Sequence, residues 1–223
     1  MKSLIVAPHP DDELLGCGGT LLRRSSHGES VGWLLMTAIT KEKGWSTQRV
    51  QSRAHEIAQV REGLSIAPHN FFPLDFVATE LDQYPISTLV EAISSVFKTF
   101  APEEVLLPHP GDIHSDHRVT FEAASACTKW FRYPSIKRVL TYETISETDF
   151  CLNPTENPFL PNLYVDISDQ LDTKLKLLNI YKSELGAHPF PRSLESVRSL
   201  SVLRGSQMGV FAAEAFQILR QFE

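Results

Sequence analysis

The first nineteen residues place an apolar strand directly in front of a cluster of acidic and histidine side chains. Residues 3–7 (SLIVA) form a short apolar run that is typical of a buried parallel strand. Pro8 and Pro10 end this strand, because proline has no backbone N–H to donate to a sheet. Residues 9–13 read HPDDE and are followed by three glycines. Since ligands bind at the carboxyl ends of strands in open α/β sheets, this stretch predicts an active-site segment.

The side chains of this stretch also suit a metal ion. His9, Asp11 and Asp12 bring one imidazole and two carboxylates within four residues, which makes half of a metal site. Carboxylates are equally favourable at a helix N-terminus, so the alternative is that the acidic residues cap the following helix. In that case His9 would be a surface residue.

A second cluster lies in residues 108–117 (PHPGDIHSDH), where three histidines and two aspartates fall within the nine positions from 109 to 117. It also follows a short apolar strand and begins a helix. His114 and His117 are three residues apart, so one helical turn could aim both rings in the same direction. Asp116 could fix the tautomer of an imidazole or orient a catalytic histidine. An accidental histidine-rich surface turn is the alternative, but two such clusters at parallel strand ends favour a catalytic zinc site with three protein ligands and a water.

Strand-like and helix-like segments alternate along the rest of the chain. We expect an irregular connection over 153–161, strands near 31–37, 70–72, 105–107, 138–143 and 163–167, and helices over 21–27, 48–64, 86–100, 120–131, 170–182, 194–203 and 212–222. This alternation predicts an α/β fold, a Rossmann-like three-layer sandwich with a mostly parallel sheet and helices on both faces. Because no internal repeat is visible, we expect one domain over residues 1–223.

Composition and charge exclude several classes of protein. The net charge is −6 and no basic block is present, which argues against a protein that binds nucleic-acid backbones. No apolar run is long enough to span a membrane, and no leader segment is visible before the first strand. Cys17, Cys127 and Cys151 are odd in number and widely spaced, so we expect no disulfide framework and a cytoplasmic location. Assembly into a homo-oligomer stays open.

Residues 7–13 (APHPDDE) and 114–117 (HSDH) together resemble the PIG-L/LmbE family of zinc-dependent de-N-acetylases. The resemblance extends over most of the chain. Arg53-x-x-Glu56 is similar to the family's Arg-x-x-Glu helix, and Tyr142-Glu143 ends a strand where the family carries the same pair. Weaker similarities lie in the C-terminal third, at 166–167, 174, 181–183 and 204–216.

The resemblance implies a role for each residue of the two clusters. His9, Asp12 and His117 would hold zinc, with another divalent metal as an alternative, and Asp11 would be the general base. His114, positioned by Asp116, would stabilise the tetrahedral intermediate or protonate the leaving amine. The implied reaction is hydrolysis of the N-acetyl group of an amino sugar or sugar conjugate, which gives acetate and a free amine.

The residues expected around the substrate are less well defined by the sequence. Arg53, His188 and Arg192 are candidates for binding it, although Arg53 could form only a helix-face ion pair and the other two could lie on the surface. Trp45 could stack on a sugar ring. We expect Glu13 to cap the helix rather than take part in the chemistry.

Two other functions fit the same motifs. One is a different metal-assisted hydrolase, acting on a small amide or a phosphoester. Two-metal phosphoesterases usually need more carboxylate ligands than are visible here. The other is a sugar-binding module with a structural zinc, for which a closed site with four protein ligands would be expected.

Overall fold

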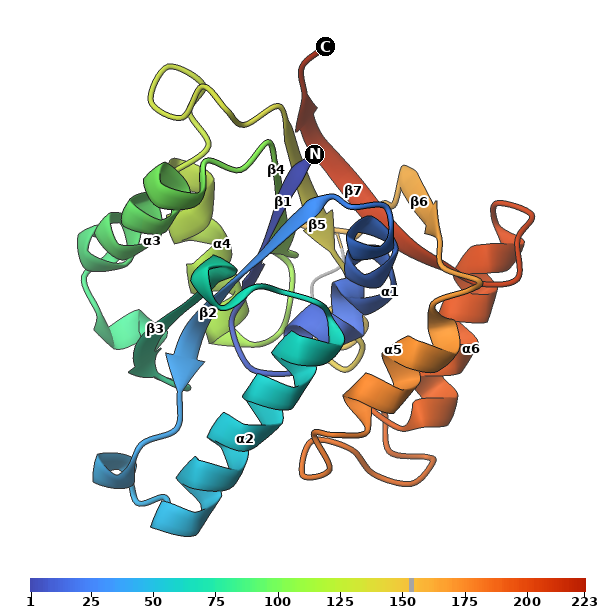
Figure 1. Cartoon of the computed structure of the whole chain (residues 1–223), viewed down its shortest axis with the longest axis horizontal. Coiled ribbons are helices and arrows are strands. Elements are labelled where there is room, and N and C mark those ends of the chain that lie inside the picture. Colours follow the sequence, from blue (N-terminus) through green and yellow to red (C-terminus); the bar gives the residue numbers. More distant parts are fainter. Residues whose placement is uncertain (153–154) are drawn as a thin grey trace.

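The computed structural model describes residues 1–152 and 155–223, and strands and helices alternate along most of it (Figure 1). Of the connection expected over 153–161, the first two residues lie outside this described part. The strands are β1 (Lys2–Ala7), β2 (Ser30–Ala38), β3 (Phe71–Val77), β4 (Glu104–Pro108), β5 (Arg138–Tyr142), β6 (Leu163–Asp166) and β7 (Ala213–Gln221). The helices are α1 (Asp12–Ser26), α2 (Thr47–Gly63), α3 (Ile86–Phe100), α4 (Ser115–Ala126), α5 (Leu171–Leu178) and α6 (Leu194–Ser206).

Within the described residues, seven strands form one mixed sheet in the order β3-β2-β1-β4-β5-β7-β6. The first five of these are parallel to one another, and β7 is antiparallel to both β5 and β6. The chain winds outward in both directions from β1 and β4, which are adjacent. The expected Rossmann-like α/β fold is therefore confirmed, and the carboxyl ends of β1 and β4 form its topological switch point.

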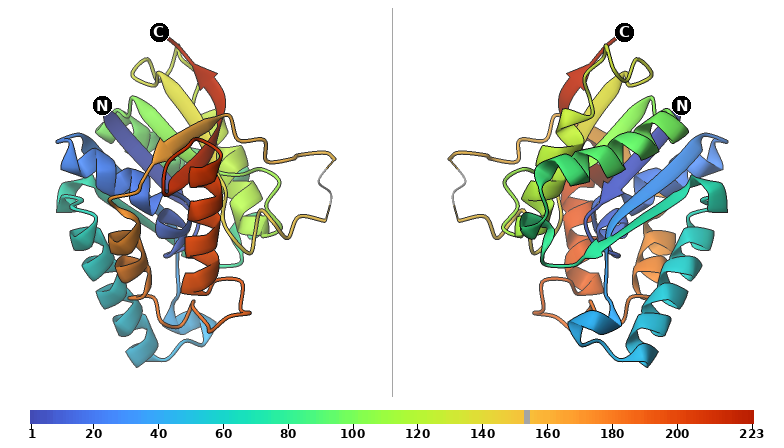
Figure 2. Two further views of the ribbon diagram at one scale, coloured as in Figure 1. Left: turned by 90° about the vertical axis from the view of Figure 1, so that its right-hand side faces the viewer. Right: turned by 90° about the vertical axis from the view of Figure 1, so that its left-hand side faces the viewer.

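Helices cover both faces of the sheet (Figure 2). Their apolar side chains form two hydrophobic cores with those of the strands. Successive side chains of a strand point to opposite faces, so Ile5 of β1 packs with α1, α2, α5 and α6, whereas Leu4 packs with α3 and α4. Because both faces of β1 are covered, its sequence is continuously apolar rather than alternating. The apolar run in front of the HPDDE stretch is thus explained by its central place in the sheet.

The glycines of the HPDDE segment lie inside α1 and allow it to approach the sheet closely. A methyl group at Gly16 would overlap the ring of Tyr142 on β5, and one at Gly19 would lie 2.7 Å from the side chain of Ile167. Glycine costs helix stability, but here the close packing of α1 requires it. The polar first turn of α1 is consequently held in a defined position over the end of β1.

The expected C-terminal helix over 212–222 is wrong, because this segment forms β7. Its residues (Ala, Glu, Gln, Leu, Arg) favour helices, but β7 lies between β5 and β6 and forms backbone hydrogen bonds with both. Two helices also end earlier than expected: α4 at Ala126 and α5 at Leu178. For β7, pairing with its neighbours in the sheet outweighs the helix propensity of its residues.

A buried ion pair connects α5, β7 and α1. Lys174 Nζ lies 2.8 Å from Glu214 Oε1 and donates to the carbonyl oxygen of Leu15 at 3.0 Å. The Glu214 carboxylate also accepts hydrogen bonds from the backbone N–H groups of Gly19 and Thr20, at 2.8 and 2.7 Å. The pair therefore ties the middle of α1 to the sheet.

Replacing Lys174 with methionine is expected to lower the free energy of unfolding by about 3–5 kcal/mol, because the buried Glu214 carboxylate then loses its counter-charge. Urea denaturation measures this loss. Arg198→Met is the control, since Arg198 pairs with Asp172 in an exposed position, and there we expect less than about 1 kcal/mol. Equal effects of the two substitutions would contradict a stabilising role of the buried pair.

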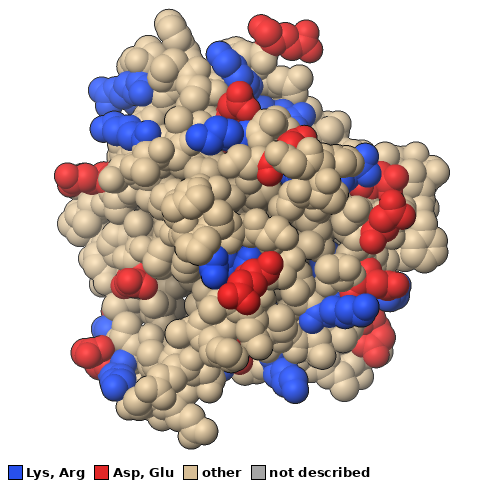
Figure 3. Space-filling model, viewed as in Figure 1, with Lys and Arg blue, Asp and Glu red and all other residues tan. Residues whose placement is uncertain are grey.

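Charged side chains of both signs are distributed over the face shown in Figure 3. Lysine and arginine side chains lie beside acidic ones at several places on this face. No helix in the described part of the chain combines the length and the apolar character needed to cross a lipid bilayer.

Candidate active site

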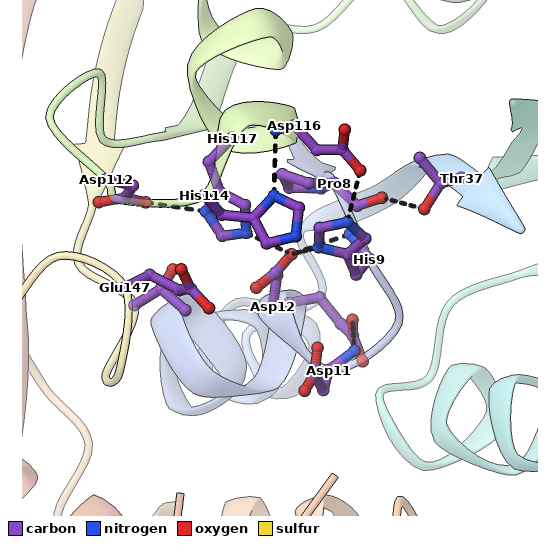
Figure 4. Close-up of polar contacts among 12 residues, drawn as sticks. Pro8, His9, Asp11, Asp12, Thr37, Asp112, His114, Asp116, His117 and Glu147 are labelled. Carbon is purple, nitrogen blue, oxygen red and sulfur yellow. Dashed lines mark hydrogen bonds and ion pairs between the residues drawn. The ribbon is translucent and has the colours of Figure 1, made fainter. Parts of the chain in front are cut away.

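The loops that follow β1 and β4 meet at the switch point of the sheet (Figure 4). The ring centroid of His9 lies 4.6 Å from that of His114 and 5.4 Å from that of His117. The two clusters, about a hundred residues apart in the sequence, therefore form one site.

Three of these side chains could hold a metal ion. His9, Asp12 and His117 each offer one ligand atom, and these atoms all lie within 4.8 Å of one another. The Oδ2 atom of Asp12 is 3.4 Å from Nδ1 of His9 and 3.3 Å from Nε2 of His117. Two imidazole nitrogens and one carboxylate oxygen are a donor set that suits zinc and leaves a coordination position for water.

Each of the two histidines has a buried carboxylate on the ring nitrogen that faces away from Asp12. Asp112 Oδ2 lies 2.8 Å from Nδ1 of His117, and Asp116 Oδ2 lies 2.8 Å from Nε2 of His9. The hydroxyl of Thr148 donates to the other oxygen of Asp112 at 2.6 Å. Carboxylates in this position fix the tautomer and the orientation of metal-binding histidines.

The Asp116 carboxylate lies against His9 rather than His114, whereas the backbone N–H of Asp116 holds the His114 ring. This carboxylate is directed to His9 and also accepts hydrogen bonds from the backbone N–H groups of Thr79 and Leu81, at 2.7 and 3.1 Å. His114 is instead the N-cap of α4, and its Nδ1 accepts the backbone N–H of Asp116 at 3.0 Å. The reason is that α4 begins at Ser115, which turns the two side chains in different directions.

A second group, His9, His114 and Asp116, also places three ligand atoms within 4.8 Å of one another. The Asp116 carboxylate already has three hydrogen-bond partners, two on Oδ2 and one on Oδ1, which leave only one of its four lone-pair positions for a metal. The group that contains Asp12 is therefore the better metal site.

The electrostatics of the site favour a cation. Burial alone would lower the pKa of both histidines, but hydrogen bonds and charge from Asp116 and Asp12 raise the pKa of His9 to about 9. Asp12 and Asp112 likewise outweigh burial and raise the pKa of His117 to about 10. Against burial, the two histidines hold the pKa of the Asp12 carboxyl well below its usual range. A divalent metal would replace these protons, and the same carboxylates that stabilise the protonated histidines would stabilise its positive charge. The residues therefore fit such an ion.

Asp11 is buried next to the three ligand-type side chains of His9, Asp12 and His117, but it has different hydrogen-bond partners. Its Oδ2 accepts a hydrogen bond from Nη1 of Arg192 at 3.0 Å. Burial and the charge of Asp12 raise the pKa of its carboxyl to about 7. A general base works best when its pKa is close to the working pH, so this carboxyl suits that role.

His114 is neutral at pH 7, because burial and the neighbouring His9 and His117 lower its pKa to about 4. Since its Nδ1 accepts a hydrogen bond from the main chain, the ring hydrogen is on Nε2. His114 can therefore donate a hydrogen bond to an oxygen that becomes negative during a reaction.

The site opens into a cavity of about 580 Å³, a volume typical of small-molecule pockets. His9, Asp11, Asp12, His114 and His117 lie in its wall. Further wall residues come from the segment between β2 and α2, from α2 itself, from β3 and from three other loops, among them Thr40, Lys41, Trp45, Arg49, Val50, Arg53, Ala54, Asp75, Thr79, Glu147, Glu184 and Arg192.

The three residues expected to bind substrate have different surroundings. Arg53 lies in the cavity wall and is also ion-paired with Glu56 at 3.1 Å and with Glu184. Arg192 lies in the wall and donates to the Asp11 carboxylate, so the structure brings these two side chains together. His188 is exposed and is not among the described residues that form this wall, so we no longer expect it to bind substrate.

Several site residues were missed by reasoning from the sequence. Asp112 lies within the histidine-rich cluster, but the sequence did not indicate that its carboxylate orients His117. Glu147 follows β5 and reaches the cavity, and Arg192 lies 3.6 Å from it. The position of Glu147 shortly after a predicted strand was the signal in the sequence that could have identified it. Glu184 carried no signal, because it follows α5 in a turn that has no motif.

Fold and site together define a class of α/β enzyme whose His/Asp site lies at the switch point of a parallel sheet. The chain belongs to the PIG-L family, because the family model described as GlcNAc-PI de-N-acetylase matches residues 4–128. It is accordingly a deacetylase, an amide hydrolase of this family.

Individual relatives extend the similarity beyond this region. The chain is 26% identical over 233 residues to diacetylchitobiose deacetylase of Thermococcus kodakarensis, covering 98% of this chain and 83% of the relative. It is 28% identical over 187 residues to the uncharacterized deacetylase YaiS of Escherichia coli, covering 81% of this chain and 90% of YaiS. The solved structure of N,N'-diacetylchitobiose deacetylase from Pyrococcus horikoshii has the same fold, with a TM-score of 0.78, 24% identity, and coverage of 98% and 84% of the two chains.

Proposed function

We propose that this deacetylase is zinc-dependent and removes the acetyl group from an N-acetylated amino sugar or sugar conjugate, giving acetate and a free amine. One observation carries the proposal: a buried aspartate with a raised pKa, the three ligand-type side chains and a neutral histidine line a single cavity. The similarity to a diacetylchitobiose deacetylase supports an N-acetyl sugar as the substrate.

In this mechanism His9, Asp12 and His117 hold the metal, and Asp112 and Asp116 orient the two imidazoles. When bound there, zinc would polarise the amide carbonyl and lower the pKa of a water molecule.

The other residues of the cavity handle protons and charge. Asp11 accepts the proton of the attacking water, with its carboxylate held by Arg192. His114 donates a hydrogen bond from its Nε2–H to the carbonyl oxygen as negative charge develops, and because its ring is neutral, the leaving amine takes the proton that Asp11 received from the water. These roles use the protonation state that each side chain has near neutral pH.

The alternatives are less well supported by the site. A closed structural zinc would need a fourth protein ligand and would leave the buried Asp11 without a purpose. A two-metal phosphoesterase would need additional carboxylates arranged around a second ion. The cytoplasmic location and the single domain stay predictions, and assembly into a homo-oligomer stays open.

Acetate release tests this function. The zinc-loaded protein would be incubated with N-acetylhexosamines and their conjugates, with N-acetyl amino acids, and with an aryl phosphate. We expect acetate only from the N-acetyl sugars, and its loss after treatment with a chelator. Release of acetate only from N-acetyl amino acids, or phosphate release alone, would contradict the proposed substrate class. Tight zinc binding with no hydrolysis of any compound would favour the binding module.

A further inference from the structure

We propose that Glu13, held by Tyr181, is a positioning residue that fixes the backbone of Asp11 and thereby aims the Asp11 carboxylate into the cavity. The inference rests on the proposed role of Asp11 as the general base. It concerns a residue that the sequence suggested only as a helix cap, and a tyrosine more than 160 positions further along the chain.

The backbone of Asp11 has a conformation that residues other than glycine rarely adopt. Its φ is 129° and its ψ is −29°. Strained conformations of this kind persist only where the surroundings hold them, and they concentrate at functional sites. The question is therefore which groups hold Asp11 in place.

The peptide group between Pro10 and Asp11 is held at both of its polar ends. Its N–H, from Asp11, donates to Oε2 of Glu13 at 3.0 Å. Its carbonyl oxygen, from Pro10, accepts a hydrogen bond from Nη1 of Arg53 at 3.1 Å. Rotation of this peptide plane, which would relax φ of Asp11, breaks both bonds.

Tyr181 connects the two groups that hold this peptide. Its hydroxyl donates to Oε1 of Glu13 at 3.1 Å, and the guanidinium of Arg53 lies 5.3 Å from the centre of its ring. Glu13 and Tyr181 are fully buried. Both oxygens of Glu13 thus have donors, which leaves its carboxyl no freedom to turn away from Asp11.

The direction of the Asp11 side chain follows from this backbone. The Cβ atom is fixed by φ, and the carboxylate that Cβ carries reaches Arg192 and the cavity. A base displaced by about 1 Å can cost on the order of 10²-fold in rate, although substrate binding is unaffected. Glu13 and Tyr181 therefore act on the chemical step through Asp11, without touching substrate.

Kinetics of Glu13→Gln and Tyr181→Phe test the inference, with Tyr133→Phe as the matched control. Glutamine has one acceptor oxygen and can accept from Asp11 N–H or from the Tyr181 hydroxyl, but not from both. Tyr133 is also buried and donates a hydroxyl bond, to Ser94 at 2.8 Å, on the opposite face of the sheet. We expect kcat to fall at least tenfold in Glu13→Gln and about threefold in Tyr181→Phe, with KM and zinc content unchanged.

Other results of this experiment would overturn the inference. If Glu13→Gln does not fold, Tyr181→Phe still decides, because a kcat equal to that of Tyr133→Phe would exclude the positioning role. A change in KM alone, or loss of zinc with intact folding, would mean that Glu13 serves substrate or metal binding instead.

A measurement of stability decides the same question without any substrate. Asp11→Gly and Asp11→Ala both remove the carboxylate, but only glycine adopts φ of 129° without strain. We expect the glycine variant to melt at a higher temperature than the alanine variant when Glu13 is present, and this difference to become smaller in Glu13→Gln, which keeps at most one of the two hydrogen bonds of Glu13. A difference that persists unchanged would show that Glu13 does not hold the backbone. Failure of the proposed function, seen as no deacetylation by the unaltered protein, would leave this comparison intact.

Discussion

Replacing Asp11 with asparagine is expected to lower kcat for deacetylation by about 10²–10⁴-fold, because the amide cannot accept a proton from the attacking water. Asparagine has nearly the same volume and tolerates positive φ better than most residues, so the strained backbone at this position should survive. Its side-chain oxygen can still accept the hydrogen bond of Arg192. The loss should therefore fall on the chemical step.

Acetate release under zinc saturation, together with zinc content by mass spectrometry, measures this effect. Asp172→Asn serves as the control, because Asp172 is an exposed aspartate on α5, and we expect it to leave both quantities unchanged. Loss of zinc from Asp11→Asn would mean that Asp11 is a ligand. An unchanged kcat would mean that another group takes the proton.

Replacing His117 with alanine is expected to abolish high-affinity zinc binding and, with it, activity. This substitution removes one of three ligands and leaves Asp12 and Asp112 as buried carboxylates without the imidazole between them. Asp112→Asn should be milder and weaken zinc binding about 10–100-fold, because it removes only the carboxylate that orients His117. A larger loss of zinc affinity in His117→Ala than in Asp112→Asn would distinguish the metal ligand from the carboxylate that orients it.

Competition with a chelator at several pH values measures these affinities. The unaltered protein should bind zinc more tightly as the pH rises toward 9–10, since His9 and His117 have pKa values raised to about 9 and about 10 and must lose their protons. His188→Ala, at an exposed position outside the cavity wall, should match the unaltered protein. If His114→Ala lost zinc and His117→Ala did not, the ion would be held by the other group of side chains.

The parallel part of the fold could be predicted because each of its strands carries its own signal. β1, β2 and β4 are buried on both faces and read as apolar runs. β7 could not be predicted this way, because its strand conformation depends on pairing with β5 and β6 rather than on its own residues. Its helix-forming composition made the local prediction wrong.

The site, like the fold, has one part that could be predicted from local sequence patterns and one part that could not. His9, Asp12 and His117 were expected to share a site because each lies in a short motif after a strand, and the topology brings these strand ends together. The partner of Asp116 and the link from Tyr181 to Glu13 could not be predicted, since no pattern in the sequence indicates which individual side chains form these two hydrogen bonds. Sequence motifs thus indicated the chemistry, and the contacts that orient it required the structure.

The position of the metal tests the account most directly. Crystals of the zinc-loaded protein, with X-ray data collected on both sides of the zinc absorption edge, would locate the ion by its anomalous signal. We predict one peak bonded to Nδ1 of His9, the Asp12 carboxylate and Nε2 of His117, with Asp11 outside bonding distance. A peak bonded to Asp11, or one held by His114 and Asp116, would contradict the assignment of ligands and base.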